Sequence, residues 1–424
     1  MTVGRTDALV LPRYGERSLT EVVPSVGAAL GLPGLVDVLG LPASSRYVIF
    51  VVDGLGAQQL REAGGSAPYL ASLLDDHEPL TCGVPSTTAT SLTSLSTSLP
   101  PGRHGLVGYT CRIPGTNRLL NTLKWDADVD PVAWQPHPSA FTRLGALGAQ
   151  TMVVNSTSFE TSGLTRCGQR HVAYHGIDSP WERLEAVCDA AAVAGSVTYA
   201  YESVLDHTGH EAGWRSPRWL AELTRVDAEL LRLRSELPTD AVLLVTADHG
   251  MVDVGPDDRV DVDEAVDLLD DVTLIGGEAR FRHVYARAGA AADVADRWTA
   301  VLGERALVRT RDEAVAAGWF GSVSERVRPR LGDVVAASTG SSAVLCRRLF
   351  PVEARMVGFH GSLTAQEMNV PLLVDAPDRA VGNSRMVGRE LTDGRLGTHG
   401  WAGADASGGT VRQDAALWPL PVTR

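Results

Sequence analysis

Acidic and histidine side chains stand at or soon after the ends of several apolar segments in this chain. The residues concerned are Asp53, Asp206, His210, Asp248, His249 and His360. Carboxylate and imidazole ligands suit zinc, and six of them are too many for one tetrahedral ion and enough for two. Two metal ions about 4 Å apart are a recurring device of phosphoryl transfer, because they clamp the attacking and leaving oxygens. The pattern therefore indicates a two-metal site.

Each of these residues also has an ordinary structural interpretation. In "LLVTADHGMVDV" (243–254), Asp-His-Gly makes a reasonable turn, since Asp tolerates turn geometry and Gly250 supplies positive φ. An aspartate at a strand end is often a helix cap. It is the conjunction of three acids and three histidines that favours a metal site.

A hydroxyl-rich stretch supplies candidates for a nucleophile. Residues 83–105 read "GVPSTTATSLTSLSTSLPPGRHG", and Ser86 to Thr90 could open a helix. A helix N-terminus offers free N–H groups and a positive dipole end to a phosphate. A hydroxyl is a weak nucleophile by itself, and coordination to a metal activates it. The alternative is a Ser/Thr-rich helix start with ordinary capping.

The elements that must position these residues alternate between strand-like and helix-like segments. Strands are expected at 47–54, 151–155, 196–203, 241–248 and 369–376. Between two of them, 216–237 has apolar residues at helical spacing, with Ser216 as N-cap and Pro217 as the first helical residue. We expect an α/β fold with a mostly parallel sheet between helices, in which ligands bind beyond the carboxyl ends of the strands.

A second, smaller α/β pattern interrupts this arrangement. We interpret 275–325 as a small cap insertion, which divides the catalytic core into 1–274 and 326–385. The glycine-rich residues 386–424 are expected to be a C-terminal tail with little periodicity.

Composition excludes several classes of function. The 424 residues are 44% hydrophobic and 21% charged, with a net charge of −13, which argues against binding to a nucleic acid polymer. No apolar run approaches the length of a membrane span. The five cysteines are scattered and form no CxxC pair, so reduced thiols and a cytoplasmic location are expected. The oligomeric state is left open.

From about residue 46 to 375, the order and spacing of these motifs resemble the alkaline phosphatase superfamily, in particular its type I phosphodiesterase/nucleotide pyrophosphatase branch. The resemblance implies an alkaline-phosphatase-like core and two Zn²⁺ ions, with other divalent metals such as Mn²⁺ as alternatives. It implies that one ion is held by Asp206, His210 and His360. It implies that the other is held by Asp53, Thr88, Asp248 and His249.

The resemblance also implies a threonine nucleophile. The branch carries it in P-T-K-T-x-P, and this chain reads Pro-Ser-Thr-Thr-Ala-Thr at 85–90, which matches Thr88. Counting back from His104-Gly105 gives the same residue, and the neighbouring Thr87 is the main rival. A covalent phosphothreonine intermediate would follow.

Two expected substrate-binding residues mark where the chain departs from the branch. Tyr109 stands where the branch has a phosphate-binding Asn. Tyr201 matches an aromatic residue that flanks a nucleobase, although its partner position beside the nucleophile is Ala89. Tyr201 has the alternative interpretation of a packed strand residue.

The function expected from this sequence is a metal-dependent hydrolase of phosphate diesters or nucleotide-type pyrophosphates, with a small-molecule phosphate ester as substrate. A phosphomonoesterase or phosphonate hydrolase of the same superfamily is the alternative, and a non-catalytic metal-binding protein is a further one. A monoester dianion usually calls for additional basic residues, for which Arg112, Lys124 and Arg143 are candidates. A sulfatase would need other residues at Gly83 and Thr87.

Overall fold

A six-stranded sheet lies at the centre of the structure, a computed structural model that describes residues 9–74, 78–125 and 128–377. In spatial order its strands are β18 (Leu372–Asp375), β8 (Ala241–Thr246), β1 (Arg46–Val52), β7 (Ser196–Glu202), β5 (Gln150–Asn155) and β6 (Ala173–Gly176). Every neighbouring pair is parallel except β18 with β8. The expected mostly parallel α/β sheet is confirmed.

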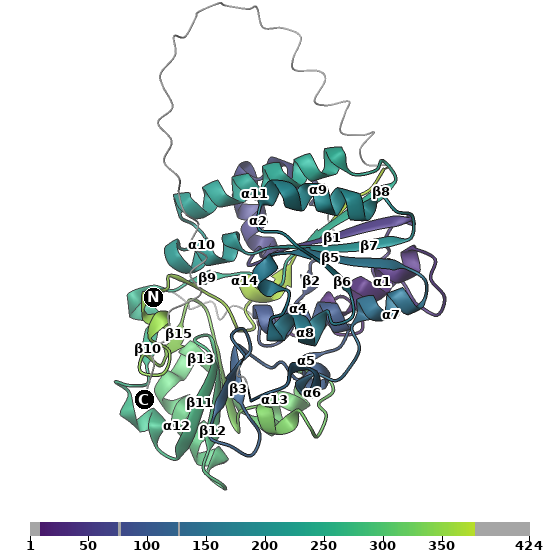
Figure 1. Ribbon diagram of the computed structural model, residues 1–424. Helices are drawn as coiled ribbons and strands as arrows, with labels where there is room; N and C mark the ends of the chain where they lie inside the picture. Colours follow the sequence, from purple (N-terminus) through teal and green to yellow (C-terminus); the bar gives the residue numbers. More distant parts are fainter. Residues whose placement is uncertain (1–8, 75–77, 126–127, 378–424) are drawn as a thin grey trace, which may run out of the picture. The chain divides into compact units, whose positions relative to one another are not determined.

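The central strands are apolar because both of their faces are covered. Residues of β7 and β8 are buried from end to end, as are those of β1 after Arg46. Figure 1 shows α2 (Ala57–Ala63), α9 (Pro180–Ala191) and α11 (Pro217–Glu236) above the sheet. Below it lie α1 (Val22–Ala29), α4 (Thr88–Thr97), α7 (Ala140–Ala146) and α8 (Gly163–Gly168). A strand between two helical layers has no solvent face, which explains its continuous apolar sequence.

Helix α11 begins where its sequence predicts. The Ser216 side chain accepts a hydrogen bond from the Trp219 N–H at 3.1 Å, and Pro217 is the first helical residue. The remaining α-helices are α3 (Pro68–Ser72), α5 (Pro101–His104), α6 (Pro131–Trp134), α10 (Val204–Ala212), α12 (Ala291–Leu302), α13 (Arg311–Ala316) and α14 (Ala365–Met368).

A second sheet of four antiparallel strands lies below the first in Figure 1. Its order is β11 (Val272–Glu278), β12 (Phe281–Ala286), β14 (Val334–Ser338) and β13 (Ala306–Thr310). A separate apolar cluster that includes Val284 and Trp298 packs against it. The strands run from 272 to 338, past the boundary expected at 325, because β14 pairs between β12 and β13. The division of the core at 275 and 325 stays a prediction, and the expected tail at 386–424 lies outside the described residues.

Four short strand pairs of the described chain lie outside the two sheets. They are β2 (Leu80–Thr81) with β17 (Asn369–Val370), β9 (Val252–Asp253) with β16 (Gly358–Phe359), β3 (Thr110–Arg112) with β4 (Leu119–Asn121), and β10 (Arg259–Asp261) with β15 (Ala343–Leu345). Three of them join segments far apart in the sequence, and β3 with β4 is a local hairpin. In the β9–β16 pair, Val252 is the partner of Phe359. This register brings the segment after His249 beside the segment before His360.

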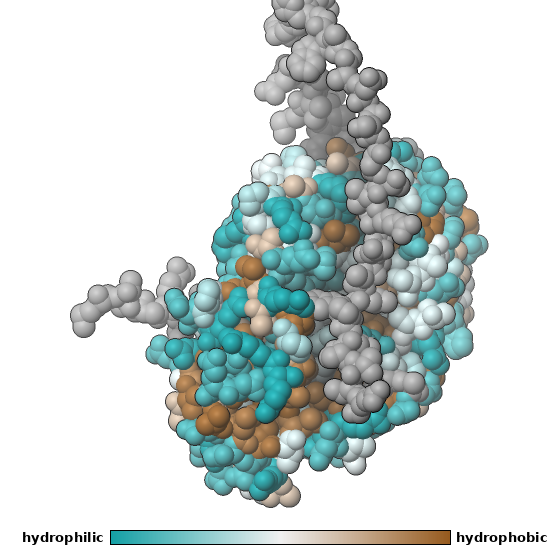
Figure 2. All heavy atoms as spheres, turned by 60° about the vertical axis from the view of Figure 1, so that its left-hand side comes forward, coloured by the Kyte–Doolittle hydropathy of each residue, from teal (hydrophilic) through white to brown (hydrophobic). Residues whose placement is uncertain are grey.

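Figure 2 shows one face of the molecule, with hydrophobic residues gathered on its lower part, at the height of the second sheet in Figure 1. Exposed apolar side chains in the sequence around that sheet include Val266, Val301 and Leu349. Among the described residues, no helix combines the length and apolar character that crossing a membrane requires.

Candidate metal centre

Two aspartates emerge from neighbouring strands at the same edge of the central sheet. Asp53 directly follows β1, and Asp248 comes two residues after β8. Because the strands are parallel and paired in register, their carboxyl ends bring the two side chains together. The Asp248 Oδ1 accepts hydrogen bonds from the N–H groups of Gly54, at 3.1 Å, and His249, at 3.0 Å. Both carboxylates are buried.

Helix α10 supplies a third acid and a histidine. Asp206 and His210 are four residues apart, so they share one face of the helix, and His210 Nε2 lies 3.2 Å from Asp206 Oδ2. Gly54, with φ of +74°, passes close to this helix, and a Cβ there would lie 2.9 Å from Asp206 Oδ1. A residue without a side chain is therefore needed beside the acids.

His360, in the loop after β16, and Thr88, at the start of α4, complete the cluster. The ring of His360 stacks on that of His249 at 3.6 Å, and its Nε2 lies 3.3 Å from the Nε2 of His210. The Oγ1 of Thr88 lies 3.2 Å from the Nε2 of His249. Ligand atoms of Asp206, His249 and His360 are within 4.8 Å of one another, as are those of Asp53, Asp248 and His249. The structure thus brings together all seven residues expected to bind metal.

The rings of the three histidines are oriented in the same way. Each Nδ1 faces a backbone carbonyl: His210 that of Gly358 at 2.8 Å, His249 that of Gly250 at 3.0 Å, and His360 that of Ser86 at 2.9 Å. A carbonyl accepts only, so each Nδ1 carries a proton, and each Nε2 is the nitrogen that can give a lone pair to a metal ion. This is the usual arrangement of metal-binding histidines, whose second nitrogen is fixed by an outer partner.

The carboxylates have free oxygens at the same place. Asp53 Oδ1, Asp206 Oδ1 and Asp248 Oδ2 are buried and have no hydrogen-bond partner. Unpaired buried charges are costly, and among the described residues these three acids form ion pairs with histidines only. Three orphaned oxygens and three convergent Nε2 atoms fit divalent cations of the zinc type, which would supply the missing positive charge.

The pKa values of the acids reflect this crowding. Burial, reinforced by repulsion from Asp248, raises the pKa of Asp53 well above its usual value. Burial also raises the pKa of Asp248. Asp206 differs because, although burial opposes it, the adjacent His210 holds its pKa below the usual range. Without a cation, the two strand-end acids resist ionisation and the helix-borne acid is paired.

Thr88 is the first residue of α4, and Thr87 precedes it with extended backbone angles as the N-cap residue. The Thr88 hydroxyl faces His249, whereas the Thr87 side chain interacts with Glu278 of β11. The two candidate nucleophiles therefore lie in different surroundings, and the Thr88 hydroxyl is the one beside the ligand cluster.

The two expected substrate-binding tyrosines have different partners. The Tyr201 hydroxyl donates a hydrogen bond to Asp53 Oδ2, which places this residue against the cluster by a contact that its sequence position did not suggest. The N–H of Tyr109 donates to Glu278 Oε1 at 2.8 Å, and its hydroxyl interacts with the Asn121 side chain. Substrate binding by Tyr109 and Tyr201 stays a prediction.

Two residues around the cluster have contacts that the sequence did not predict. Glu278 is buried at the end of β11, its Oε2 has no hydrogen-bond partner, and burial raises its pKa to about 8. Ser86 links two loops, since its hydroxyl donates to the Ser362 carbonyl at 2.6 Å and accepts from the Gly361 N–H at 3.1 Å. Ser86 stands in the same motif as Thr88, which was a usable signal, whereas nothing local marks Glu278.

A buried ion pair supports the loops that carry two of the histidines. The Nε of Arg280 lies 2.7 Å from Oε1 of Glu367, and both side chains are fully buried. The same Oε1 accepts from the N–H of Ser362, two residues after His360. The Glu367 carbonyl accepts from the N–H of Gly250, which follows His249. Glu367 thereby fixes both loops to each other.

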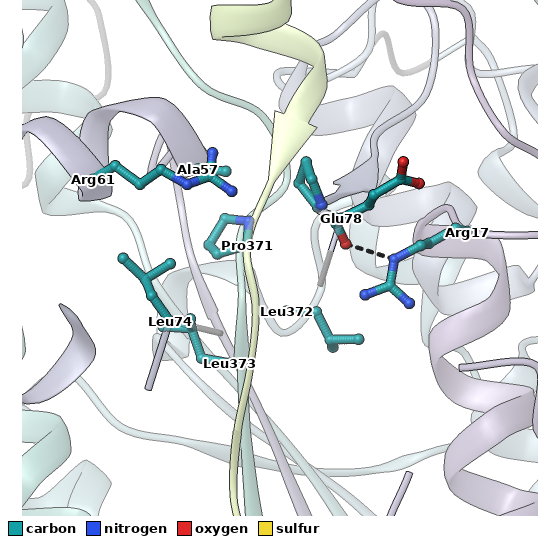
Figure 3. A pocket seen from close by; sticks show the side chains of 9 residues that line it. Arg17, Ala57, Arg61, Leu74, Glu78, Pro371, Leu372 and Leu373 are labelled. Atoms are coloured by element: carbon teal, nitrogen blue, oxygen red, sulfur yellow. Dashed lines mark hydrogen bonds between the residues drawn. The ribbon is translucent and has the colours of Figure 1, made fainter. Parts of the chain in front are cut away.

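Figure 3 shows a small hollow elsewhere on the molecule, in which Pro371 and Leu373 lie between Arg61 and Arg17. The Nε of Arg17 donates to the Glu78 carbonyl at 2.6 Å. None of the seven candidate metal ligands lines this hollow.

Comparison with known sequences adds to this geometry. Residues 47–363 match the family described as type I phosphodiesterase / nucleotide pyrophosphatase, which is well over half of the chain. The chain belongs to this family. It is accordingly a hydrolytic enzyme of the phosphodiesterase/nucleotide pyrophosphatase type.

Solved structures of this fold resemble the chain at low sequence identity. Murine ectonucleotide pyrophosphatase/phosphodiesterase 5 has a TM-score of 0.62 and 16% identity, over 78% of this chain and 87% of that one. The human protein has a TM-score of 0.60 and 15% identity, over 78% and 88%. Phosphonoacetate hydrolase from Sinorhizobium meliloti, in complex with phosphonoformate, has a TM-score of 0.59 and 21% identity, over 79% and 91%. The alkaline-phosphatase-like fold expected from the sequence is confirmed.

Proposed function

We propose that this chain is a metal-dependent hydrolase of phosphate diesters or nucleotide-type pyrophosphates, in which Thr88 is the nucleophile and two zinc-type ions are bound. The observation that carries the proposal is the convergence of three unpaired carboxylate oxygens and three histidine Nε2 atoms beside the Thr88 hydroxyl. Asp206, His210 and His360 would hold one ion. Asp53, Thr88, Asp248 and His249 would hold the other, and Mn²⁺ could take the place of Zn²⁺.

The bound ions would lower the pKa of the Thr88 hydroxyl and neutralise charge that develops on the phosphate. In the first step, Thr88 Oγ1 forms a bond to phosphorus and the ester bond to the leaving alcohol breaks, so that the alcohol departs with the proton that Thr88 gives up. In the second step, water hydrolyses the phosphothreonine and releases a phosphomonoester. The free N–H groups at the start of α4 can hold a non-bridging oxygen throughout.

The charges around the cluster support a diester rather than a monoester. A monoester dianion needs additional cations, and two basic candidates from the sequence have other partners. The guanidinium of Arg112 lies over the ring of Tyr285 at 4.5 Å, and that of Arg143 donates to the carbonyls of Thr97 and Pro138. Glu278, whose pKa burial raises to about 8, lies beside Thr87 and supplies no positive charge there. A substrate with a single negative charge suits these surroundings better.

A phosphonate hydrolase or phosphomonoesterase is the second candidate, because a phosphonoacetate hydrolase shares the fold. A substrate panel separates these activities. Zinc-reconstituted protein would be assayed on matched aryl phosphodiesters, aryl monoesters, nucleotide pyrophosphates and phosphonoacetate. We expect the largest kcat/KM on a diester or pyrophosphate, and a monoester or phosphonate preference of tenfold or more would overturn the proposal.

We also propose that the protein works in the cytoplasm. All five cysteines are free thiols in the structure, and Cys82, Cys111, Cys167 and Cys346 are buried. Reduced thiols are typical of that compartment. Fractionation of cells that express the chain with its natural ends would test the location.

A further inference from the structure

Tyr201 lies on β7, in the strand next to the one that ends in Asp53. In the register of the two strands, Tyr201 is the partner of Val51 on β1. Asp53 comes two positions after Val51, so Tyr201 and Asp53 project from the same face of the sheet. The tyrosine is 7% exposed, and its ring packs edge-on against Phe159 at 6.4 Å between centroids. Its hydroxyl donates a hydrogen bond to Asp53 Oδ2.

Because of that hydrogen bond, the two carboxylate oxygens of Asp53 have different surroundings. Oδ2 is held by the tyrosine, while Oδ1 has no partner and lies 3.4 Å from His249 Nε2. At Asp248 the same division is made by the backbone, because Oδ1 accepts two N–H groups and Oδ2 is left free. The backbone N–H of Asp53 donates to the Glu202 carbonyl instead. At Asp53, one carboxylate oxygen is therefore held by a side chain rather than by backbone N–H groups.

We infer that Tyr201 is a positioning residue of the metal centre: its hydroxyl fixes the Asp53 carboxylate so that Oδ1 faces the ion. The inference rests on the proposed function, in which Asp53 is a metal ligand. Outer partners of this kind typically change metal affinity or activity by about 10- to 100-fold when removed.

The same contacts bear on the class of substrate. Stacking on a nucleobase needs an accessible ring face, and the Tyr201 ring is buried against Phe159 while its hydroxyl is engaged. The other position expected to flank a base is Ala89, which is also buried. Neither Tyr201 nor Ala89 therefore offers a base an exposed aromatic face, which favours selection of phosphodiesters by their phosphate group.

The test of the positioning role is the zinc affinity of Tyr201→Phe, measured by competition with a chelator of known affinity. The variant keeps the ring and removes only the hydroxyl. Tyr199→Phe is the matched control, since Tyr199 lies two residues earlier on the same strand and face, is buried, and interacts through its side chain with Gln169. We expect a 10- to 100-fold weaker affinity for one ion in Tyr201→Phe and no change in Tyr199→Phe.

An affinity of Tyr201→Phe within twofold of the wild type would overturn the inference. Should the variant be destabilised, the rise in Tm on adding zinc measures the same loss on the folded protein, and it should be smaller than in the wild type. The zinc concentration for half-maximal activity should increase, which general damage to the fold would not produce. Wild-type protein that binds no zinc would instead contradict the proposed function.

Tyr201→Leu separates positioning from stacking. This variant removes the ring, so a base clamp predicts a loss of kcat/KM on a nucleotide aryl ester and none on a simple alkyl aryl diester. A positioning role predicts the same fold loss on both. A loss confined to the nucleotide substrate would overturn the inference and restore the base-flanking role.

Discussion

The two groups of candidate ligands are positioned by different kinds of structure. Asp53, Asp248 and His249 follow buried parallel strands, and their side chains are between 0% and 5% exposed. Asp206 and His210 lie on α10 with side chains 12% and 16% exposed, and His360 lies in a loop after β16. The first group is fixed by the sheet, whereas the second is fixed by a helix and by contacts between loops.

This difference determines how the pKa values of the acids in each group are shifted. The strand-end acids face each other, and burial raises the pKa of both. The helix-borne acid lies beside His210, and that pair lowers the pKa of Asp206. The two strand-end acids therefore need a cation most. At Asp206 on the helix, the pair with His210 already supplies part of the positive charge.

Removal of the nucleophile should have the largest effect. The Thr88 hydroxyl contacts the strand-end group through His249. Because Thr88→Ala removes the attacking oxygen, kcat on a diester should fall by about 10³- to 10⁶-fold while both metal equivalents remain. Steady-state kinetics and elemental analysis measure the two quantities. Thr87→Ala is the control and should keep activity within tenfold. If Thr87→Ala is inactive and Thr88→Ala is not, the nucleophile is Thr87.

Loss of a carboxylate or histidine ligand from either group should remove one metal ion. We expect Asp248→Ala and His360→Ala each to retain about one of two zinc equivalents, because the other ligand set is left intact. His175→Ala is a suitable control, since that histidine is exposed on β6. Elemental analysis after zinc reconstitution decides the point, and one ion or none in the wild type would contradict the two-metal site.

Much of this architecture follows from the sequence because it depends on local signals. The buried strands read as apolar runs, the α11 start reads as Ser216-Pro217, and the ligands stand at strand ends in a recognisable order. The contact of Tyr201 with Asp53 is not such a signal, because it depends on the register of β1 with β7.

The rest depends on contacts between residues far apart in the chain, which leave no local pattern. The Nδ1 partners of His210 and His360 are the backbone carbonyls of Gly358 and Ser86, 148 and 274 positions away. Glu278 reaches Tyr109 from the second sheet, 169 positions away. No spacing rule predicts such pairs, because they arise only when distant segments of the chain pack together.

Glu278 offers a test of how the second sheet bears on the site. Burial raises its pKa to about 8 from an ordinary value of 4.5, so the folded protein binds this proton more tightly than the unfolded chain. The resulting stability is present at low pH and is lost as pH increases from about 4.5 to about 8, at about 1.4 kcal/mol per pKa unit. In metal-free protein, the free energy of unfolding should therefore decrease between pH 5 and pH 8.5 by a few kcal/mol less in Glu278→Gln than in the wild type. Parallel stability curves from urea unfolding would contradict this account.

The smallest expected effects distinguish the two ligand groups most directly, because they differ in sign. In metal-free protein near pH 8, Asp248→Asn should increase the free energy of unfolding by about 1 kcal/mol, since the raised pKa of Asp248 means that its charge destabilises the fold as pH increases. The amide oxygen can still accept the N–H groups of Gly54 and His249. Near pH 6, below the raised pKa of His210, Asp206→Asn should instead decrease the free energy of unfolding by about 1–3 kcal/mol, because the lowered pKa of Asp206 reflects a favourable pair with protonated His210. Urea unfolding in the presence of a chelator measures both changes, and shifts of the same sign would show that the sheet and the helix present equivalent acids. With zinc added, both variants should be less stable than the wild type, because each has lost a ligand.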